Sequence, residues 1–357
     1  MAELLKAPAE ILFKEELEAL IKEDKNNPKP INWKLSPRAV LTYLMGGKAG
    51  KKEITPKYIG QKRLMEIAIA TLATDRALLL YGVPGTAKSW VAEHLAAAIS
   101  GDSTRIVQGT AGTSEEAIRY GWNYASLLAK GPTDEAVVPS PIMRAMELGT
   151  IGRVEELTRI GADVQDALLT ILSEKALPIP ELNKTIRAVE GFNIIATANN
   201  RDKGVNEMSS ALKRRFNTVI LPVPGTIKEE VEIVQRRVSS MTQKIGMKEN
   251  HIKQIETIVT IFRELRSGLT QDGKTKLKVP SGTLSPAEAI SVMYQGITMA
   301  HWFGDNELNA EDISSAMVGA IVKDPVQDAV IFKEYMETVM KERSDWKDLY
   351  RACKNQL

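Results

Sequence analysis

The stretch LLLYGVPGTAKSWVAEHL, residues 78–95, decides the fold class of this chain. An apolar run of strand length enters a turn that begins at Gly82, and a helical pattern follows with Val91, Leu95 and Ala98 on one face. Backbone N–H groups of such a turn and of the first helical turn point at an anion, and the helix dipole adds to the attraction. The stretch therefore predicts a phosphate-binding loop. The alternative is a strand–turn–helix joint with an incidental lysine, which the flanking elements disfavour.

The loop supplies candidate ligands for a nucleotide and its metal. We expect Lys88 to reach the β- and γ-phosphates and the Ser89 hydroxyl to coordinate Mg²⁺. A glycine usually precedes this lysine, but Ala87 stands there; alanine tolerates the helical φ/ψ of a helix start, so we expect a small cost. The loop residues expected to contact the nucleotide are Gly82, Val83, Pro84, Gly85, Thr86, Ala87, Lys88, Ser89 and Trp90. The motif alone predicts phosphate binding and no particular reaction.

Composition limits the classes of protein to consider. The chain has 357 residues, 43% hydrophobic and 26% charged, which allows two or three domains with a sizeable core. Its formal charge of +2 gives no bulk attraction to nucleic acid, although a local basic groove stays open as an alternative. There is one cysteine, the N-terminal pattern is not that of a signal peptide, and no apolar run approaches the roughly 20 residues that cross a bilayer. We expect a cytoplasmic protein without a membrane partner.

Sequence patterns divide the chain into three parts. Residues 1–50 predict a helical extension, with helices over 3–23 and 37–44. Residues 51–225 alternate strand-length apolar runs with helical patterns, which predicts an α/β domain with a mainly parallel sheet covered by helices on both faces. Residues 226–357 predict a helical domain. Its expected helices span 226–245, 248–267, 285–303, 309–322 and 325–352.

An acidic pair, Glu155 and Glu156, follows the apolar run at 150–154. Adjacent strand residues point in different directions, so one pair can serve two tasks. We expect Glu155 to lie toward the Mg²⁺ on Ser89, through a water, and Glu156 to polarise the attacking water. Burying unpaired carboxylates is costly, so this pair needs solvent or a cation. Taken alone, such a pair is more often a surface turn.

Two further signals follow downstream. The run FNIIATANN, 192–200, leads an apolar strand to Asn199, whose amide can hydrogen-bond both the γ-phosphate and the attacking water. The segment ALKRRF ends a short helix with Arg214 and Arg215, and arginines there can stabilise a transferring phosphoryl group, an effect of roughly 10³–10⁵ in rate. Each signal is weak alone, so the prediction depends on their order: phosphate loop, acidic pair, polar strand end, arginines, helical domain.

That order resembles the AAA+ ATPases and, within them, the MoxR-type group with an insert in helix 2, including its YehL-like branch. The resemblance covers roughly 58–324 and implies an αβα P-loop NTPase sandwich with a C-terminal helical lid. It implies that Tyr58, Ile59 and Gly60 contact adenine, that Asn199 is sensor 1 and that Arg215 is the arginine finger. It also places a β-hairpin at 176–191 and the helix-2 insert around 119–139.

Three positions depart from the family pattern. The first acid of the pair is Glu155 where the family usually has aspartate, and its extra methylene lengthens the reach by roughly 1.5 Å. Gly152 and Arg153 interrupt a strand that is usually apolar, and a nearby carboxylate is a candidate partner for Arg153. Ala287 stands where the sensor 2 arginine belongs, which leaves coupling of the lid to the γ-phosphate open.

From these features we expect a Mg-ATP hydrolase that works as a ring, because an arginine at the far end of its own domain acts most naturally on a neighbour's nucleotide. The resemblance implies a hexamer and a client protein with a von Willebrand factor A domain. Two alternatives stay open. One is a nucleotide-gated scaffold with weak hydrolysis. The other is a nucleic-acid motor working through Lys184 and Arg187 of the hairpin, although a solvated hairpin tip is favoured.

Overall fold

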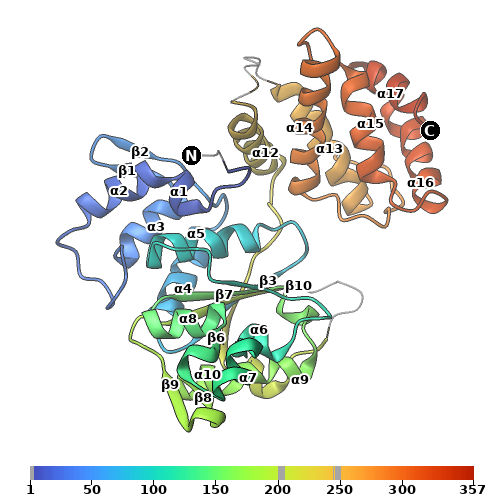
Figure 1. Cartoon of the computed structure of the whole chain (residues 1–357). Coiled ribbons are helices and arrows are strands. Elements are labelled where there is room, and N and C mark those ends of the chain that lie inside the picture. The colour runs from blue at the N-terminus through green and yellow to red at the C-terminus, as the bar shows by residue number, and fades with distance from the viewer. Residues whose placement is uncertain (1–3, 200–205, 244, 246–250) are drawn as a thin grey trace. The chain divides into compact units, whose positions relative to one another are not determined.

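The computed structural model describes residues 4–199, 206–243, 245 and 251–357. The chain divides into two compact units: unit 1 holds Met1–Val83 and Ala87–Leu221, and unit 2 holds Pro84–Thr86 and Pro222–Leu357 (Figure 1). The change from one unit to the other after Leu221 lies four residues before the end of the predicted α/β segment. Residues 3, 244 and 248–250 of the predicted helices lie outside the described residues.

Unit 1 is built on a five-stranded parallel sheet with the strand order β11-β3-β10-β7-β4. Its strands are β3 (Ala77–Gly82), β4 (Ile106–Gln108), β7 (Ile151–Glu155), β10 (Asn193–Asn199) and β11 (Phe216–Ile220). Because the strands are parallel, their carboxyl ends meet at one edge, and Asn199 of β10 pairs in register with Gly82 of β3. Ligands of open α/β sheets bind at this edge.

Both faces of the sheet are buried, each against its own layer of helices (Figure 1). Leu78 and Leu80 of β3 enter the first core with Ile195, whereas Leu79 and Ile194 enter the second. This period of two is the one a pleated strand imposes. Helices α3 (Pro37–Met45), α4 (Lys62–Leu72) and α5 (Lys88–Ser100) contribute to the first core, and α8 (Pro141–Leu148) and α10 (Ala167–Glu174) to the second. The predicted α/β fold is confirmed.

The N-terminal segment shares the first core. The predicted helix over 3–23 is two helices, α1 (Ala9–Leu12) and α2 (Lys14–Glu23), which meet at Phe13. Leu17 and Leu20 of α2 pack with Tyr43 and Leu44 of α3 in the same core as α5. A short antiparallel pair, β1 (Gly47–Ala49) and β2 (Lys52–Ile54), connects α3 to the segment before α4.

Besides the β1–β2 pair, the described part of unit 1 contains two further two-stranded sheets. In the predicted insert, α6 (Glu115–Ile118) precedes β5 (Tyr120–Trp122), α7 (Tyr124–Lys130), a 3₁₀ turn (Asp134–Ala136) and β6 (Val137–Pro139), and β5 pairs with β6. In the predicted hairpin, β8 (Ala176–Ile179) pairs with β9 (Lys184–Arg187) across a 3₁₀ turn (Pro180–Leu182). Short helices α9 (Ala162–Gln165) and α11 (Ser210–Lys213) and a 3₁₀ turn (Leu157–Arg159) complete the unit.

Unit 2 is a helical bundle. Its helices are α12 (Ile227–Thr242), α13 (Ile252–Ser267), α14 (Pro286–Phe303), α15 (Ala310–Ile321), α16 (Gln327–Tyr335) and α17 (Lys347–Lys354). They surround one apolar core that includes Phe262, Met293, Met317 and Phe332. The single helix predicted over 325–352 is interrupted by a π turn (Met336–Met340) and a 3₁₀ turn (Ser344–Trp346). Within the described ranges, no helix of either unit is long and apolar enough to cross a membrane.

Candidate active site

The phosphate loop joins β3 to α5 at the carboxyl edge of the sheet. Lys88 is the first residue of α5, and its side chain is almost fully buried. Its Nζ donates hydrogen bonds to the carbonyl oxygens of Gly82 at 3.1 Å and Val83 at 2.8 Å. The ammonium group is thus folded back over the loop, next to the end of β3. Pro84, Gly85 and Thr86 complete the loop, in which Gly85 has a φ of 80°.

Ala87 corrects one expectation from the sequence. It is the residue before the first helical position, and its φ of 64° and ψ of 22° are left-handed rather than helical. A left-handed conformation costs a residue with a Cβ roughly 1–2 kcal/mol, so the expected small cost at this position is wrong. The reason is geometric: the loop needs its left-handed turn one residue before the helix starts, where glycine would be unstrained.

Glu155, the last residue of β7, connects the loop to the sheet. The residue is 2% exposed, and its Oε2 accepts hydrogen bonds at 2.6 Å from Ser89 Oγ and at 2.6 Å from Thr197 Oγ1. The other oxygen, Oε1, accepts a hydrogen bond from Nη2 of Arg153 at 2.7 Å. Arg153 therefore has the carboxylate partner that its position in the strand suggested. Gly152 in the same strand leaves room for α8, because a Cβ there would lie 2.9 Å from Ile142 Cδ1.

Ser89 and Glu155 can hold a hard cation. Their oxygens converge at the start of α5, and Mg²⁺ in nucleotide sites takes one or two protein oxygens and completes its shell with phosphates and water. The donor chemistry of these two residues fits Mg²⁺. The same carboxylate is also paired with a guanidinium, which is an unusual neighbour for a metal ligand.

Glu156 follows the last residue of β7, and its side chain points toward Asn199 of β10. Its backbone is left-handed, with a φ of 53°, and its N–H donates to Thr197 Oγ1 at 3.1 Å. Both carboxylate oxygens accept from Nδ2 of Asn199, at 3.0 and 2.8 Å, and Nε of Arg159 lies 3.7 Å from Oε2. Positive φ at a residue other than glycine is often found at functional positions. The two acids of the pair thus face different partners, Glu155 toward the loop and Glu156 toward Asn199.

Two residues at this edge were missed by the sequence analysis. Thr197 is completely buried and contacts both acids, and the signal for it was a hydroxyl two residues before Asn199 in a mainly apolar strand. Gly109 follows β4, and its N–H donates to the carbonyl of Glu155 at 2.7 Å. A Cβ on Gly109 would lie 2.7 Å from that carbonyl oxygen and closer still to that of Glu156. Only a contact across strands reveals this role, so no local pattern could.

The segment predicted to contact adenine lies against the loop helix. Tyr58 is buried, Ile59 is half-buried and Gly60 is exposed. Just before them, the carbonyl of Lys57 accepts a hydrogen bond at 2.8 Å from the indole of Trp90, two residues after Lys88. Burial lowers the pKa of Lys57, although its ion pair with Glu16 at 2.6 Å opposes the shift.

Arg214 and Arg215 lie at the opposite ends of the strands, where the amino ends of β3 and β11 meet. Arg215 precedes β11, and its carbonyl accepts a hydrogen bond from the N–H of Ala77, at the amino end of β3. Its guanidinium donates to Ser173 Oγ at 2.8 Å and to the carbonyl of Ala211 at 3.0 Å. The length of β3, about 16 Å at 3.3 Å per residue, separates this edge from the phosphate loop. The structure therefore brings Lys88, Ser89 and the acidic pair together and leaves both arginines apart from them.

Comparison with known proteins assigns both halves of the chain. Residues 77–216 match the AAA domain of the dynein-related subfamily, and residues 228–354 match the YehL-like AAA+ ATPase C-terminal domain. Uncharacterized protein YehL of Escherichia coli (strain K12) is 39% identical over 357 residues, covering 98% of this chain and 97% of YehL. An uncharacterized protein of Staphylococcus aureus (strain NCTC 8325) is 26% identical over 230 residues, covering 63% of this chain and 82% of that protein.

A solved structure supports the fold. NtrX from Brucella abortus in complex with ADP has a TM-score of 0.51 and 13% identity; the match covers 83% of this chain and 64% of the NtrX chain. The fold and the two family matches together define an AAA+ ATPase. Within that class, the chain belongs to the YehL-like AAA+ ATPases.

Proposed function

We propose that this chain hydrolyses Mg-ATP at the carboxyl edge of its sheet, within a ring of identical subunits, and uses the cycle to remodel or activate a partner protein in the cytoplasm. The observation that carries the hydrolytic part is the convergence of Ser89, Glu155 and Glu156 beside Lys88. The resemblance to MoxR-type proteins supports a hexamer and a client with a von Willebrand factor A domain.

The residues of the site divide the work as follows. Lys88 exchanges its carbonyl partners for the β- and γ-phosphate oxygens, which attract its ammonium more strongly because they are charged. Ser89 and Glu155 would hold Mg²⁺, which when bound would neutralise charge on the phosphates. Glu156 accepts a proton from the attacking water. For this step the hydrogen bonds between Glu156 and Asn199 break, and Asn199 Nδ2 then donates to the γ-phosphate. The two changes are coupled because the carboxylate and the amide are now hydrogen-bonded to each other.

Action of Arg215 on a neighbour's nucleotide is supported by its place at the amino end of β3, about 16 Å along the strand from the loop. A side chain there reaches the γ-phosphate of another subunit more readily than that of its own. Such a contact is heterologous, and repeated heterologous contacts form a ring where the rotation between subunits closes. Charge stabilisation by an arginine of this kind accounts for roughly 10³–10⁵ in rate.

The test is turnover by two single variants, alone and mixed. Glu156→Gln and Arg215→Ala are each expected to bind ATP and to hydrolyse it at least about 10²-fold more slowly than the wild type. In mixed rings, an Arg215→Ala subunit with its own Glu156 faces a neighbour with an intact arginine, so mixing the two inactive proteins restores part of the turnover. Recovery in the mixture supports the trans arrangement. No recovery, in mixtures shown to form mixed rings, contradicts it.

The partner is tested separately with the Glu156→Gln protein. This variant, loaded with ATP, is expected to retain its client, so affinity purification with ATP and again with ADP identifies proteins that bind only the ATP state. A von Willebrand factor A domain protein in the ATP sample supports the proposed client. Nucleic acid in that sample, together with stimulation of turnover that weakens with salt, supports the motor alternative instead.

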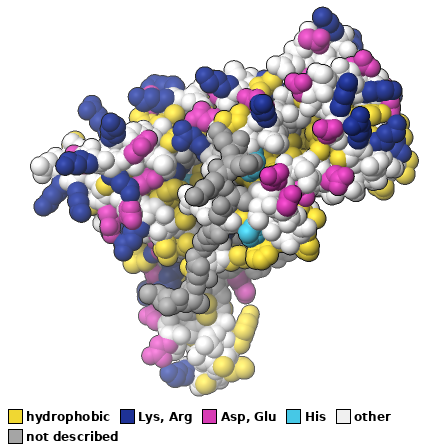
Figure 2. Space-filling model, turned by 90° about the horizontal axis from the view of Figure 1, so that it is seen from above, with side chains coloured by type: hydrophobic (Ala, Val, Ile, Leu, Met, Phe, Trp, Pro, Cys, Tyr) yellow, Lys and Arg dark blue, Asp and Glu magenta, His cyan; other side chains and the backbone are white. Residues whose placement is uncertain are grey.

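The structure gives the motor alternative little support. Lys184 of the hairpin is ion-paired with Asp134 of the insert at 2.9 Å. On the one face drawn in Figure 2, acidic and basic side chains are interspersed. The scaffold alternative has one specific observation in its favour, the guanidinium of Arg153 on Glu155. A wild-type turnover no faster than that of Glu156→Gln would establish the scaffold.

A further inference from the structure

Glu155, the acid expected to face the metal, already has an internal cation. Arg153 and Glu155 are two residues apart in β7 and so point to the same face of the sheet. Their side chains are 7% and 3% exposed, and Nη2 lies 2.7 Å from Oε1. The guanidinium also donates to the carbonyl oxygens of Ser103 at 2.9 Å and Ser89 at 3.3 Å. These contacts fix the arginine between the start of α5 and the acid.

The two carboxylate oxygens of Glu155 have different partners. Oε1 is occupied by Arg153, while Oε2 faces the hydroxyls of Ser89 and Thr197. An aspartate at 155 would be shorter by a methylene, roughly 1.5 Å, and would not span the same two sets of partners. The glutamate and the arginine are therefore complementary departures from an ordinary metal-binding strand end. Together they bury a carboxylate whose charge is balanced before any metal arrives.

We propose that Arg153 is a positioning residue that fixes Glu155 and weakens the binding of Mg²⁺ with nucleotide. This inference rests on the proposed function, in which Glu155 belongs to the Mg²⁺ shell. The physical reason is competition: the carboxylate already interacts with a guanidinium, and a second cation next to it meets the repulsion of the first. An arginine beside a carboxylate changes its affinity for a competing proton by about 10- to 1,000-fold, and the effect on a metal ion has the same sign.

The quantity to measure is the enhancement of ADP binding by Mg²⁺. The dissociation constant of a fluorescent N-methylanthraniloyl-ADP is determined for the full chain in Mg²⁺ and in EDTA. The EDTA value divided by the Mg²⁺ value gives the enhancement without any turnover. Arg153→Met is expected to raise this ratio at least about tenfold, with the EDTA value unchanged. Arg153→Lys keeps the charge and is expected to stay near the wild-type ratio. If Arg153 had only a structural role, Arg153→Met would weaken nucleotide binding equally in Mg²⁺ and in EDTA.

Glu155→Gln separates the inference from the proposed function. It is expected to remove most of the enhancement, and Arg153→Met should have no effect on the ratio in that background. If Glu155→Gln leaves the enhancement intact, Glu155 does not serve the metal and that part of the proposed function fails. If Glu155→Gln removes it while folded Arg153→Met leaves the ratio unchanged, only the inference is overturned. Should Arg153→Met not fold, Arg153→Gln retains a donor for Ser103 without the charge, and the same two outcomes apply.

Discussion

Two buried glutamates, Glu155 in unit 1 and Glu264 in unit 2, have nearly identical surroundings. Each is 2% exposed. Each accepts a hydrogen bond from an arginine N–H, Arg153 at 2.7 Å and Arg343 at 2.6 Å, and each accepts a hydrogen bond from a hydroxyl at 2.6 Å. Burial and charge pairing are therefore the same for both, so these criteria alone do not separate an acid proposed to serve a ligand from a structural one.

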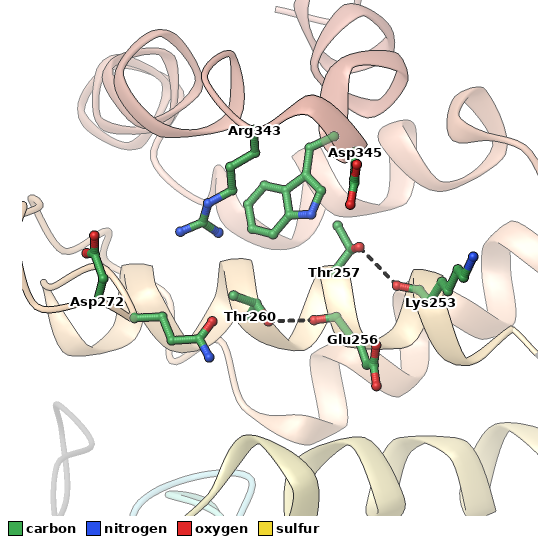
Figure 3. Close-up of a pocket in the computed structure, with 9 residues that line it drawn as sticks. Lys253, Glu256, Thr257, Thr260, Asp272, Arg343 and Asp345 are labelled. Carbon is green, nitrogen blue, oxygen red and sulfur yellow. Dashed lines mark hydrogen bonds between the residues drawn. The ribbon is translucent and has the colours of Figure 1, made fainter.

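The partners of Glu264 belong to, or pack against, the hydrophobic core of unit 2. Its hydroxyl donor is Tyr335 of α16, and burial together with the carboxylate raises the pKa of that phenol, so the donor keeps its proton. Its arginine lies over the ring of Trp346, with 4.1 Å between the guanidinium carbon and the ring centroid, and faces a groove of about 1030 Å³ (Figure 3). The groove is lined by Lys253, Glu256, Thr257, Thr260, Gln271, Asp272, Arg343, Asp345 and Trp346.

The partners of Glu155 are groups that a ligand can take over. Ser89 stands at the N-terminus of a helix that follows a phosphate loop, and Thr197 stands two residues before Asn199 at the carboxyl edge of the sheet. The position of the donors in the fold, more than burial or charge pairing, distinguishes Glu155 from Glu264. Each of the following changes tests that distinction.

The largest expected effect is on stability, from Arg343→Met in unit 2. It leaves Glu264 buried without its ion partner, and breaking a buried pair costs 3–5 kcal/mol; because the arginine side chain is 30% exposed, we expect about 3 kcal/mol. Urea unfolding measures the loss, while ADP binding should be unchanged. The double variant with Glu264→Gln should recover part of the stability. A loss below about 1 kcal/mol would show that Glu264 needs no charge partner.

The next effect is on catalysis, from Gly109→Ala in unit 1. The added Cβ meets the backbone oxygens of both acids, one of them at 2.7 Å. Relief requires a shift of the acidic pair of about 1 Å, and such a displacement costs on the order of 10² in turnover. Gly112→Ala is the matched control, because a Cβ there lies 4.0 Å from its nearest neighbour, Thr110 Oγ1. Equal turnover in the two variants would mean that the position of the acids does not limit the reaction.

The same contrast explains which parts of the fold and of the site could be predicted from the sequence. Periodicity predicted the parallel sheet and the helical unit, because a pleated strand and a packed helix impose their periods on neighbouring residues. Residue order also placed Ser89 near Glu155, since the carboxyl ends of parallel strands meet at one edge. Gly109 and Thr197 escaped because their roles are contacts between strands. The charge balance of Glu155 was only suggested, since the direction of the Arg153 side chain depends on the carbonyls around it.

A smaller, stabilising effect is expected from Ala87→Gly. Removing left-handed strain at an L-residue gains roughly 1–2 kcal/mol, and the greater freedom of glycine in the unfolded chain takes back about 0.5–1 kcal/mol. The net expectation is a gain of about 0.5–1 kcal/mol, measured by urea unfolding without nucleotide. Ala97→Gly, inside the following helix α5, should act in the opposite direction because it only lowers helix propensity and packing. If both variants destabilise equally, Ala87 is not strained.

The smallest effect is a pH dependence that belongs to unit 2. Burial tends to raise the pKa of Asp328, but the hydroxyl of Ser281 and three backbone N–H groups that donate to its carboxylate outweigh burial and lower it below 3.8. A carboxyl whose folded-state pKa is depressed contributes stability above its unfolded value, and that stability is lost as the pH falls through the folded one. Melting temperatures of the wild type and Asp328→Asn should therefore differ most near neutral pH and converge as the pH falls from about 4 through the lower folded-state pKa. If the two curves of melting temperature against pH run parallel, these hydrogen bonds do not favour the charged carboxylate of Asp328. Its charge then contributes nothing to stability, in contrast to the charge-paired carboxylate of Glu155.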